Sequence, residues 1–228
     1  MKRFEAIREI EGRRFERILV KTHILTSRDE IGEVVKRYAG KLLQPGDIIT
    51  ISESAVAITQ GRAIPTEKLK PRLLARLLWR FVRKVPYGIG LRNPYSMECA
   101  IREVGEIRII IASFIAAFTK LIGRRGDFYR IAGKQAAMID APHTSGVKEY
   151  YECVIMGPKE PDAVARRVKK VTGFETAIMD VNDIGGSWVV GASSGIDKKL
   201  VEEVMRDNPA GQGDSLTPIV IIREVKEK

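Results

Sequence analysis

The sequence predicts a compact α+β or mixed α/β fold. Its 44% hydrophobic and 30% charged residues are typical of a soluble globular protein. Strand-like and helix-like patterns alternate irregularly along the chain, with no repeat, linker or low-complexity stretch. A length of 228 residues allows one large core or two small ones. We therefore expect mixed sheets with packed helices in a single unit, 1–228, with two interleaved subdomains of about 1–135 and 136–228 as the alternative.

The first half of the chain carries clear start and stop signals. Ser27, with Glu30 three residues later, forms a capping box for a helix that Gly40 ends. Asn93 followed by Pro94 is a cap and a first-turn proline for another helix, which ends at Gly105. In chain order we expect a strand at 15–25, a helix to about 39, a turn at 44–47, strands at 48–51 and 55–58, and helices at 71–84 and 94–105.

In the second half, the pattern over Ile107 to Ile111 indicates a buried strand, and Ala112 to Leu121 a helix. The most apolar run, Ile109 to Phe118, has ten residues, whereas a membrane span needs roughly 20, so we assign it to the core. We then expect strands at 150–156, 177–180, 188–190 and 219–222, and helices at 161–173 and 198–206.

The positive charge is concentrated in one segment. The net charge is +10, and Lys68 to Met97 contains eight basic residues and no acidic one. A basic amphipathic helix of this kind can bind nucleic acid or an anionic membrane. Because no aromatic stacking platform or nucleic-acid motif accompanies it, we favour a solvated face or a flank that attracts an anionic substrate. We expect no membrane partner, and nucleic acid is the less favoured one. The apolar side of this predicted helix consists of Leu73, Leu74, Leu77, Leu78 and Phe81.

The cysteines and the N-terminal residues narrow the class of protein further. Cys99 and Cys153 lie far apart and form no C-x-x-C, and with two histidines in the chain this argues against a zinc finger or ribbon. The start, Met1 to Glu9, has acidic residues where a secretory signal needs an apolar run. We expect a cytoplasmic protein.

Aspartates and glycines cluster between Thr176 and Asp197. Carboxylates beside glycines, which free backbone N–H groups, suit a hard cation and a phosphate. A hairpin followed by a glycine-rich helix start explains the same residues equally well. Asp180 and Asp183 lie at the end of one predicted strand and Asp140 at the end of another. These three carboxylates are our candidate ligands for Mg²⁺ or Mn²⁺, with phosphate as co-ligand.

Two further glycine-containing segments are candidates for binding an anionic cofactor. Gly191 to Gly195 matches the G-x-S-x-G nucleophile elbow, but both histidines precede Ser193, which is the wrong order for that triad. The loop, with Ser193 and Ser194, is better read as a helix start offering N–H groups to phosphate, or as a tight turn. At Gln60 to Arg62, Gly61 allows close backbone approach and Arg62 can reach an anionic group, although a plain turn has the same composition.

Taken in order, these motifs resemble the deazaflavin coenzyme F-420 glutamate ligases. That family has a Leu-x-x-Gly-Asp strand entry, matched by Leu43 to Asp47, and a strand ending in Glu-Gly-Arg, matched by Gln60 to Arg62. An aspartate loop follows at Asp140, and Pro158 to Arg167 resembles Pro-x-x-Pro-Asp-x-x-Ala-Arg-Arg. Ile178 to Gly185 stands where the family has Ser-Asp-Thr-Phe-Gly. The similarity covers most of the chain, thinly between Val85 and Gln135.

The resemblance implies a GTP- and Mg²⁺- or Mn²⁺-dependent ligase that joins L-glutamate to a phospholactate-bearing deazaflavin through an acyl phosphate. It also implies an intertwined α+β homodimer. By position, Asp140 together with Asp180 or Asp183 would hold metal, with Asp140 and Asp183 acting in catalysis. Gly61 and Arg62 would line the nucleotide or anionic substrate, and the glycine-containing loops add Gly185, Ser193 and Ser194 as further candidate cofactor-binding residues.

The chain departs from the family pattern at several polar positions. Where the family has a lysine and a Ser-Lys pair, this chain has Ser54, Ala57 and Ile58. Where the family has the glutamate of Glu-Gly-Arg, this chain has Gln60. The alternative function is therefore a non-catalytic relative that binds an anionic cofactor or nucleic acid through the basic segment 68–92.

Overall fold

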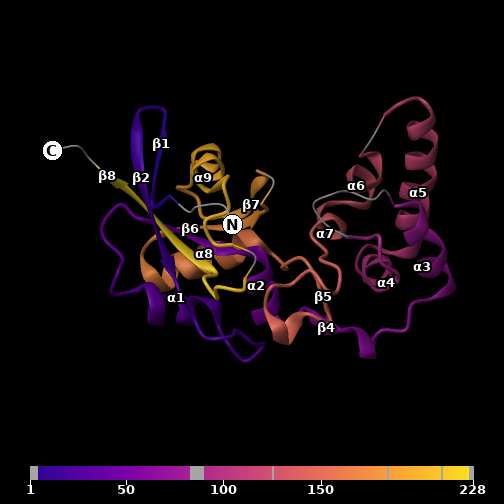
Figure 1. The fold of residues 1–228 in the computed structure, drawn as a ribbon, viewed down its shortest axis with the longest axis horizontal. Coiled ribbons are helices and arrows are strands. Elements are labelled where there is room, and N and C mark those ends of the chain that lie inside the picture. The colour runs from indigo at the N-terminus through magenta and orange to yellow at the C-terminus, as the bar shows by residue number, and fades with distance from the viewer. Residues whose placement is uncertain (1–4, 83–89, 125, 184, 212, 226–228) are drawn as a thin grey trace. The chain divides into compact units, whose positions relative to one another are not determined.

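A computed structural model describes residues 5–82, 90–124, 126–183, 185–211 and 213–225, and the chain forms two compact units. Unit 1 comprises Met1–Gly61 and Pro158–Lys228, and unit 2 comprises Arg62–Gly157. Figure 1 shows their elements. The alternative subdomain boundary near residue 135 falls inside unit 2.

Unit 1 is built on a six-stranded mixed sheet with strand order β1-β2-β8-β3-β6-β7. β3 and β6 are parallel, and the other neighbouring pairs are antiparallel. The mixed sheet with packed helices that the sequence predicts is therefore confirmed. The strands are β1 Ile7–Ile10, β2 Arg13–Val20, β3 Ile48–Ser52, β6 Glu175–Val181, β7 Ser187–Ala192 and β8 Ile219–Val225.

Helices cover both faces of this sheet. α9 (Lys198–Met205) packs on the face that carries Ala177 and Met179 of β6. Because side chains alternate along a strand, Ile178 belongs to the opposite face. That face contacts α8 (Pro161–Thr172) and α2 (Glu53–Thr59), and α1 (Ile31–Ala39) packs beside α8. The fully buried isoleucines of the sheet are Ile49, Ile51, Ile178, Ile219 and Ile221.

Several predicted boundaries in unit 1 shift, and one element changes type. The cap of α1 is Glu30, whose carboxylate accepts from the Glu33 backbone N–H at 2.9 Å, and not Ser27. The strand expected at 15–25 begins at Arg13 and ends at Val20. The strand predicted at 55–58 is wrong, since these residues lie in α2. All four are buried, and a helix buried on every side has no polar face to reveal a helical period.

Unit 2 is mainly helical. A two-stranded sheet pairs β4 (Ala63–Pro65) with β5 (Cys153–Ile155), so the strand expected at 150–156 is shorter than predicted. The predicted cap of α4 is confirmed, because Asn93 Oδ1 accepts from the Tyr95 N–H at 2.8 Å. The helices are α3 Leu73–Leu78, α4 Pro94–Val104, α5 Glu106–Leu121, α6 Asp127–Ala132 and α7 Lys134–Ala137; short 3-10 turns lie at Thr66–Lys68, Trp79–Phe81 and Lys148–Tyr150.

A buried carboxylate fixes part of this helical unit. Glu98 of α4 is fully buried and accepts from the Arg72 backbone N–H at 3.0 Å and from the Arg102 Nε at 2.8 Å. Burial by itself raises the pKa of Glu98, but the hydrogen bonds from Arg72 and Arg102 outweigh it and the pKa is lowered. The carboxylate therefore stays charged and ties the start of α3 to α4.

Two predictions for unit 2 are wrong. The strand expected at 107–111 is the first part of α5. The run Ile109 to Phe118, assigned to the core, is mostly at the surface: among α5 residues only Ile109 and Ala112 are buried. The helix expected at 71–84 ends earlier, with α3 followed by a 3-10 turn to Phe81, and Lys84 lies outside the described residues. No helix in the described part of the chain is long and apolar enough to cross a membrane.

Candidate active site

The polar strand ends of unit 1 meet at one edge of its sheet. β3 and β6 run parallel with Ser52 opposite Met179, so their carboxyl ends lie at the same edge. β8 runs antiparallel to β3 and begins there, and the Ser52 N–H donates to the Pro218 carbonyl at 2.9 Å. The carboxyl ends of parallel strands are where α/β sheets commonly bind ligands. We call this edge, with residues 52–54, 180–183, 185–186, 208–211 and 213–218, the strand-end edge.

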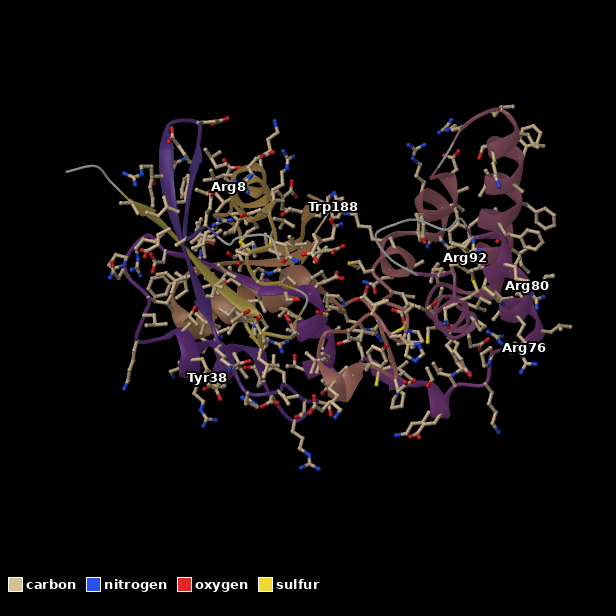
Figure 2. All side chains as sticks on the ribbon, viewed as in Figure 1. Arg8, Tyr38, Arg76, Arg80, Arg92 and Trp188 are labelled. Carbon is tan, nitrogen blue, oxygen red and sulfur yellow. The ribbon has the colours of Figure 1, made fainter. Side chains whose placement is uncertain are left out.

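Asp180 is a partly buried carboxylate at this edge. It lies opposite Trp188 of β7, which is labelled in Figure 2, and by alternation it belongs to the same sheet face as Ile178. Burial raises the pKa of Asp180, and no ion pair to it occurs among the described residues. A partly buried carboxylate without a cation suits a metal ion, because buried charges are usually paired or coordinate metals.

Asp183 lies in the turn that joins β6 to β7. The turn is closed by two bonds of 2.9 Å: the Asn182 N–H donates to the Gly186 carbonyl, and the Gly186 N–H donates to Asn182 Oδ1. Asp183 itself is exposed, and its Oδ1 accepts from Asn208 Nδ2 at 2.8 Å. Gly185 has φ +90°, a conformation that favours glycine.

Asn208 is a functional candidate that the sequence reasoning missed. It is buried, has φ +53°, and its amide donates both to Asp183 and to the Gly211 carbonyl at 3.2 Å. It thus joins the Asp183 turn to the loop that contains Gly211 and Asp214. The one signal available was the Asn208-Pro209 dipeptide, a common turn former.

The N-terminal motif reaches the same edge through Ser52 and Ser54, whose hydroxyls lie 2.9 Å apart. The next two departures from the family pattern, Ala57 and Ile58, are buried in α2. Gln60 has a structural role, since its amide donates to the Lys159 carbonyl at 3.0 Å and accepts from the Lys159 N–H at 2.8 Å.

Gly61 and Arg62 were expected to line a nucleotide or anionic substrate. Gly61 has φ +69°, as a glycine turn requires. Arg62 belongs to unit 2, where its guanidinium lies 2.9 Å from Glu103 Oε1 and its Nε donates to the Gly157 carbonyl at 2.6 Å. Arg62 is therefore engaged inside its own unit, and its contact with an anionic ligand stays a prediction.

The serine loop before α9 is held by a carboxylate. Buried Ser193 donates from Oγ to Glu175 and accepts from the Thr176 N–H at 2.9 Å, whereas Ser194 is exposed. The Lys169 ammonium, together with the Ser193 hydroxyl, lowers the pKa of Glu175. α9 is capped separately by Asp197, which accepts from the Leu200 N–H at 3.2 Å. Phosphate binding by Ser193 and Ser194 stays a prediction.

The motif glycine of this loop, Gly191, has a packing explanation. A Cβ built there would lie 2.3 Å from the Pro161 carbonyl carbon and 2.6 Å from the Asp162 backbone nitrogen. The Asp162 carboxylate in turn accepts from the Ala192 N–H at 2.8 Å. Gly191 therefore lets the start of α8 pack directly on β7.

The three predicted metal ligands are divided between the units. Asp180 and Asp183 belong to unit 1, and Asp140 belongs to unit 2, where its backbone forms a β-bridge with Ile155. In the described part of the chain, no group of three or more His, Cys, Asp or Glu side chains is arranged to hold a metal. Asp180 and Asp183 remain candidates, because Mg²⁺ commonly takes one or two carboxylates with water and phosphate oxygens, and their joint binding of a metal stays a prediction. Asp140 as a ligand stays a prediction.

Comparison with known protein families shows which family the chain belongs to. A family model described as F420-0:gamma-glutamyl ligase matches residues 19–205. The chain belongs to this ligase family. The matched range begins in β2 and ends with α9, so it contains the strand-end edge up to the Asp183 turn. It also contains all of unit 2. No curated protein sequence matches the chain significantly.

Proposed function

We propose that the protein is a GTP- and divalent-metal-dependent amide ligase. It would join the amine of L-glutamate to a carboxylate of a coenzyme F-420-type or other anionic acceptor. The observation that carries this proposal is membership of the ligase family over 19–205. The position of Asp180 and Asp183 at the carboxyl end of β6, which runs parallel to β3, supports it.

The residues of the strand-end edge have separate roles in this proposal. Asp180 and Asp183 would hold Mg²⁺ or Mn²⁺, and Asn208 would orient the Asp183 carboxylate through its 2.8 Å hydrogen bond. The metal, when bound, would offset the negative charge of nucleotide phosphates. The hydroxyls of Ser52 and Ser54 are available at the same edge as donors to an anionic oxygen.

One observation favours a second candidate function. Ala57 and Ile58, which replace polar or cationic residues of the family, are buried and cannot contact phosphate. A relative without ligase activity that binds an anionic cofactor or nucleic acid through the basic segment 68–92 is the alternative. The homodimer implied by the resemblance also belongs to the proposal, and sedimentation velocity of the purified chain tests it.

Titration calorimetry with GTP or ATP in the presence of Mn²⁺ tests the ligase proposal first. Product formation from a deazaflavin acceptor and L-glutamate would then be followed by mass spectrometry. The decisive variants are Asp180→Asn and Asp183→Asn, and Asp197→Asn is the matched control because asparagine also caps a helix. Loss of an oriented carboxylate ligand should reduce metal-dependent activity by about a hundredfold, with the control unchanged. Nucleotide binding that is absent, or unaffected by both variants, would refute the proposal.

A further inference from the structure

Helix α5 of unit 2 presents an exposed apolar face. Phe114 is 74% exposed and Leu121 84% exposed, values that are unusual for large apolar side chains on a soluble helix. The exposed residues are Ile107, Ile111, Phe114, Ile115, Phe118 and Leu121, with Ile122 directly after the helix. Their spacing of three and four puts them on one side, while Ile109 and Ala112 on the other side pack into the core of unit 2. The apolar face is therefore a consequence of the sequence pattern.

Helix α3 and the turn after it add a second apolar stripe. Leu73, Leu77 and Phe81 are exposed at intervals of four residues, while Ala75 packs into the same core as α5. The two helices begin next to each other, since the Arg72 guanidinium donates to Glu106 at 3.2 Å. We call the exposed residues of α3 and α5, with the turn to Phe81, the α3–α5 face.

Cations accompany this apolar surface. Arg76 and Arg80 are exposed beside Leu77, and Figure 2 labels both on α3 and the turn that follows it. Arg76 Nε donates to the Pro71 carbonyl at 3.1 Å, and the Arg80 guanidinium lies 5.7 Å from the Trp79 ring. Neither arginine forms an ion pair among the described residues.

The charge of unit 2 is strongly unbalanced. Its segment 62–157 contains 17 lysines and arginines against 8 acidic residues, whereas the rest of the chain has 22 against 21. Four of its acidic residues are already paired with arginines inside the unit: Glu98 with Arg72 and Arg102, Glu103 with Arg62, Glu106 with Arg72, and Asp127 with Arg124 and Arg130. From Ile107 to Gly126 the sequence has no acidic residue at all.

Contrary to the expectation of no membrane partner drawn from the sequence, we propose that the α3–α5 face docks the protein on an anionic phospholipid membrane. Apolar side chains enter the headgroup boundary and neighbouring arginines contact lipid phosphates, as interfacial amphipathic helices do. At 16 residues, α5 is about 24 Å long and lies in the plane of the interface without crossing the bilayer. The positive charge beside the apolar face thus indicates an anionic membrane as the partner.

The same charge argues against the other occupants of this face. A contact between two copies through this face would bring together two surfaces of the same strong positive charge, since segment 62–157 has 17 basic and 8 acidic residues, and like charges across an interface repel. Nucleic acid would match the charge but would leave the isoleucines and leucines without a favourable environment, because its binding depends on phosphate contacts and base stacking.

Vesicle flotation of the full chain tests the proposal. The vesicles are phosphatidylcholine alone or phosphatidylcholine with about one third phosphatidylglycerol, each at low and at high salt. We expect binding to the anionic vesicles, weakened by salt. Phe114→Asp with Phe118→Asp, and separately Arg76→Glu with Arg80→Glu, should each lower the partition coefficient at least about tenfold.

Matched controls separate docking from a general change in charge or solubility. Lys198→Glu with Lys199→Glu makes the same charge change on unit 1, and Leu42→Asp removes an exposed leucine there. Both controls should bind anionic vesicles like the unaltered protein. Circular dichroism and sedimentation velocity on every variant show that folding and oligomeric state are kept.

Three results would overturn the proposal. The first is no flotation with anionic vesicles. The second is flotation that Phe114→Asp with Phe118→Asp leaves unchanged, which would indicate charge attraction without docking. The third is a dimer that the same double variant converts to monomer, which would show that a second copy covers the face. None of these results depends on ligase activity, so the ligase proposal can fail or succeed separately.

Discussion

Replacing Asp47 by asparagine should destabilise unit 1 strongly, although Asp47 is far along the chain from its partner. Asp47 is 3% exposed and forms a bidentate pair with Arg223 of β8, Nε to Oδ1 at 2.9 Å and Nη2 to Oδ2 at 2.7 Å. Its Oδ2 also accepts from the Gln44 N–H at 2.8 Å, which closes the turn before β3. The hydrogen bonds that Arg223 donates to Asp47 raise the pKa of Arg223. Asp47, the aspartate of the Leu43–Asp47 motif, therefore anchors the start of β3 to the last strand, β8.

The size of the effect follows from these contacts. Asparagine keeps one acceptor oxygen but loses the charge and one arm of the bidentate pair with Arg223. If its oxygen takes the place of Oδ1, the Gln44 N–H loses its acceptor as well. Charge-assisted hydrogen bonds contribute about 1.5–3 kcal/mol, and breaking a buried pair costs up to about 5 kcal/mol. Because Arg223 is partly accessible and also donates to the Leu42 carbonyl, we expect a loss of about 2–4 kcal/mol.

Urea unfolding followed by tryptophan fluorescence measures this loss in unit 1 alone. The chain has two tryptophans, and in a Trp79→Phe background the signal reports Trp188 of unit 1. With a slope of roughly 1–3 kcal/mol per molar urea, Asp47→Asn should lower the midpoint by about 1–2 M. Glu224→Gln is the control, because it alters the solvent-exposed pair with Arg13 on the neighbouring position of β8. Equal midpoints for Asp47→Asn and the control would contradict the anchoring role.

Three further predictions follow from single contacts. Gly191→Ala should destabilise unit 1 by about 1–3 kcal/mol in the same assay, because the new methyl would overlap the Pro161 backbone; a change below 0.5 kcal/mol, roughly the size of a neutral surface substitution, would disprove the packing role. The Lys169 ammonium lowers the pKa of Glu175, so its stabilisation is present above the unfolded pKa of about 4.3 and is lost as pH falls through the folded value. Glu175→Gln should therefore lower the unfolding midpoint at pH 7 but have little effect near pH 3, and an equal effect at both would exclude the ion pair as the cause. Burial raises the pKa of Cys99 to about 12, so its thiol should react with a disulfide reagent only after unfolding, and rapid labelling of the folded chain at Cys99 would contradict the structure.

The sequence predicted best those helices whose ends are fixed by local caps and terminal glycines. The helix from Asn93-Pro94 to Gly105 and the helix from Pro161 to Gly173 both agree with the structure, because caps and terminal glycines act locally. The failures lie where tertiary context decides. Residues 55–58 are buried on all sides as a helix, and their alternating valine and isoleucine were read as a strand.

The apolar run of α5 shows a different limit. Its composition is that of a protein core, and nothing local shows that one side lacks a covering element. Only the packing of Ile109 and Ala112, with Phe114 and Phe118 left exposed, reveals the difference. Sequence reasoning therefore gave the right hydrophobicity and the wrong environment.

Only part of the candidate site could be predicted from the sequence, and the reason is physical. Asp180 and Asp183 were found because they end a strand, and strand ends have a readable pattern. That β6 lies parallel to β3, and that Asn208 holds Asp183, depends on pairing across more than a hundred residues in one case and on a buried loop in the other. Neither relation has a local signal beyond turn composition.

Several departures from the ligase family lie in α2 or directly after it, and the structure explains the one at Gln60. Gln60 forms two hydrogen bonds with the Lys159 backbone, as donor to its carbonyl and acceptor from its N–H. A glutamate, as in the family pattern, could accept but could not donate, and its charge would face the Lys159 carbonyl. The glutamine therefore fastens the end of α2 to the segment before α8 in a way that the family residue cannot. The departures along α2 and the candidate carboxylates Asp180 and Asp183, at and just after the end of β6, are thus separate features.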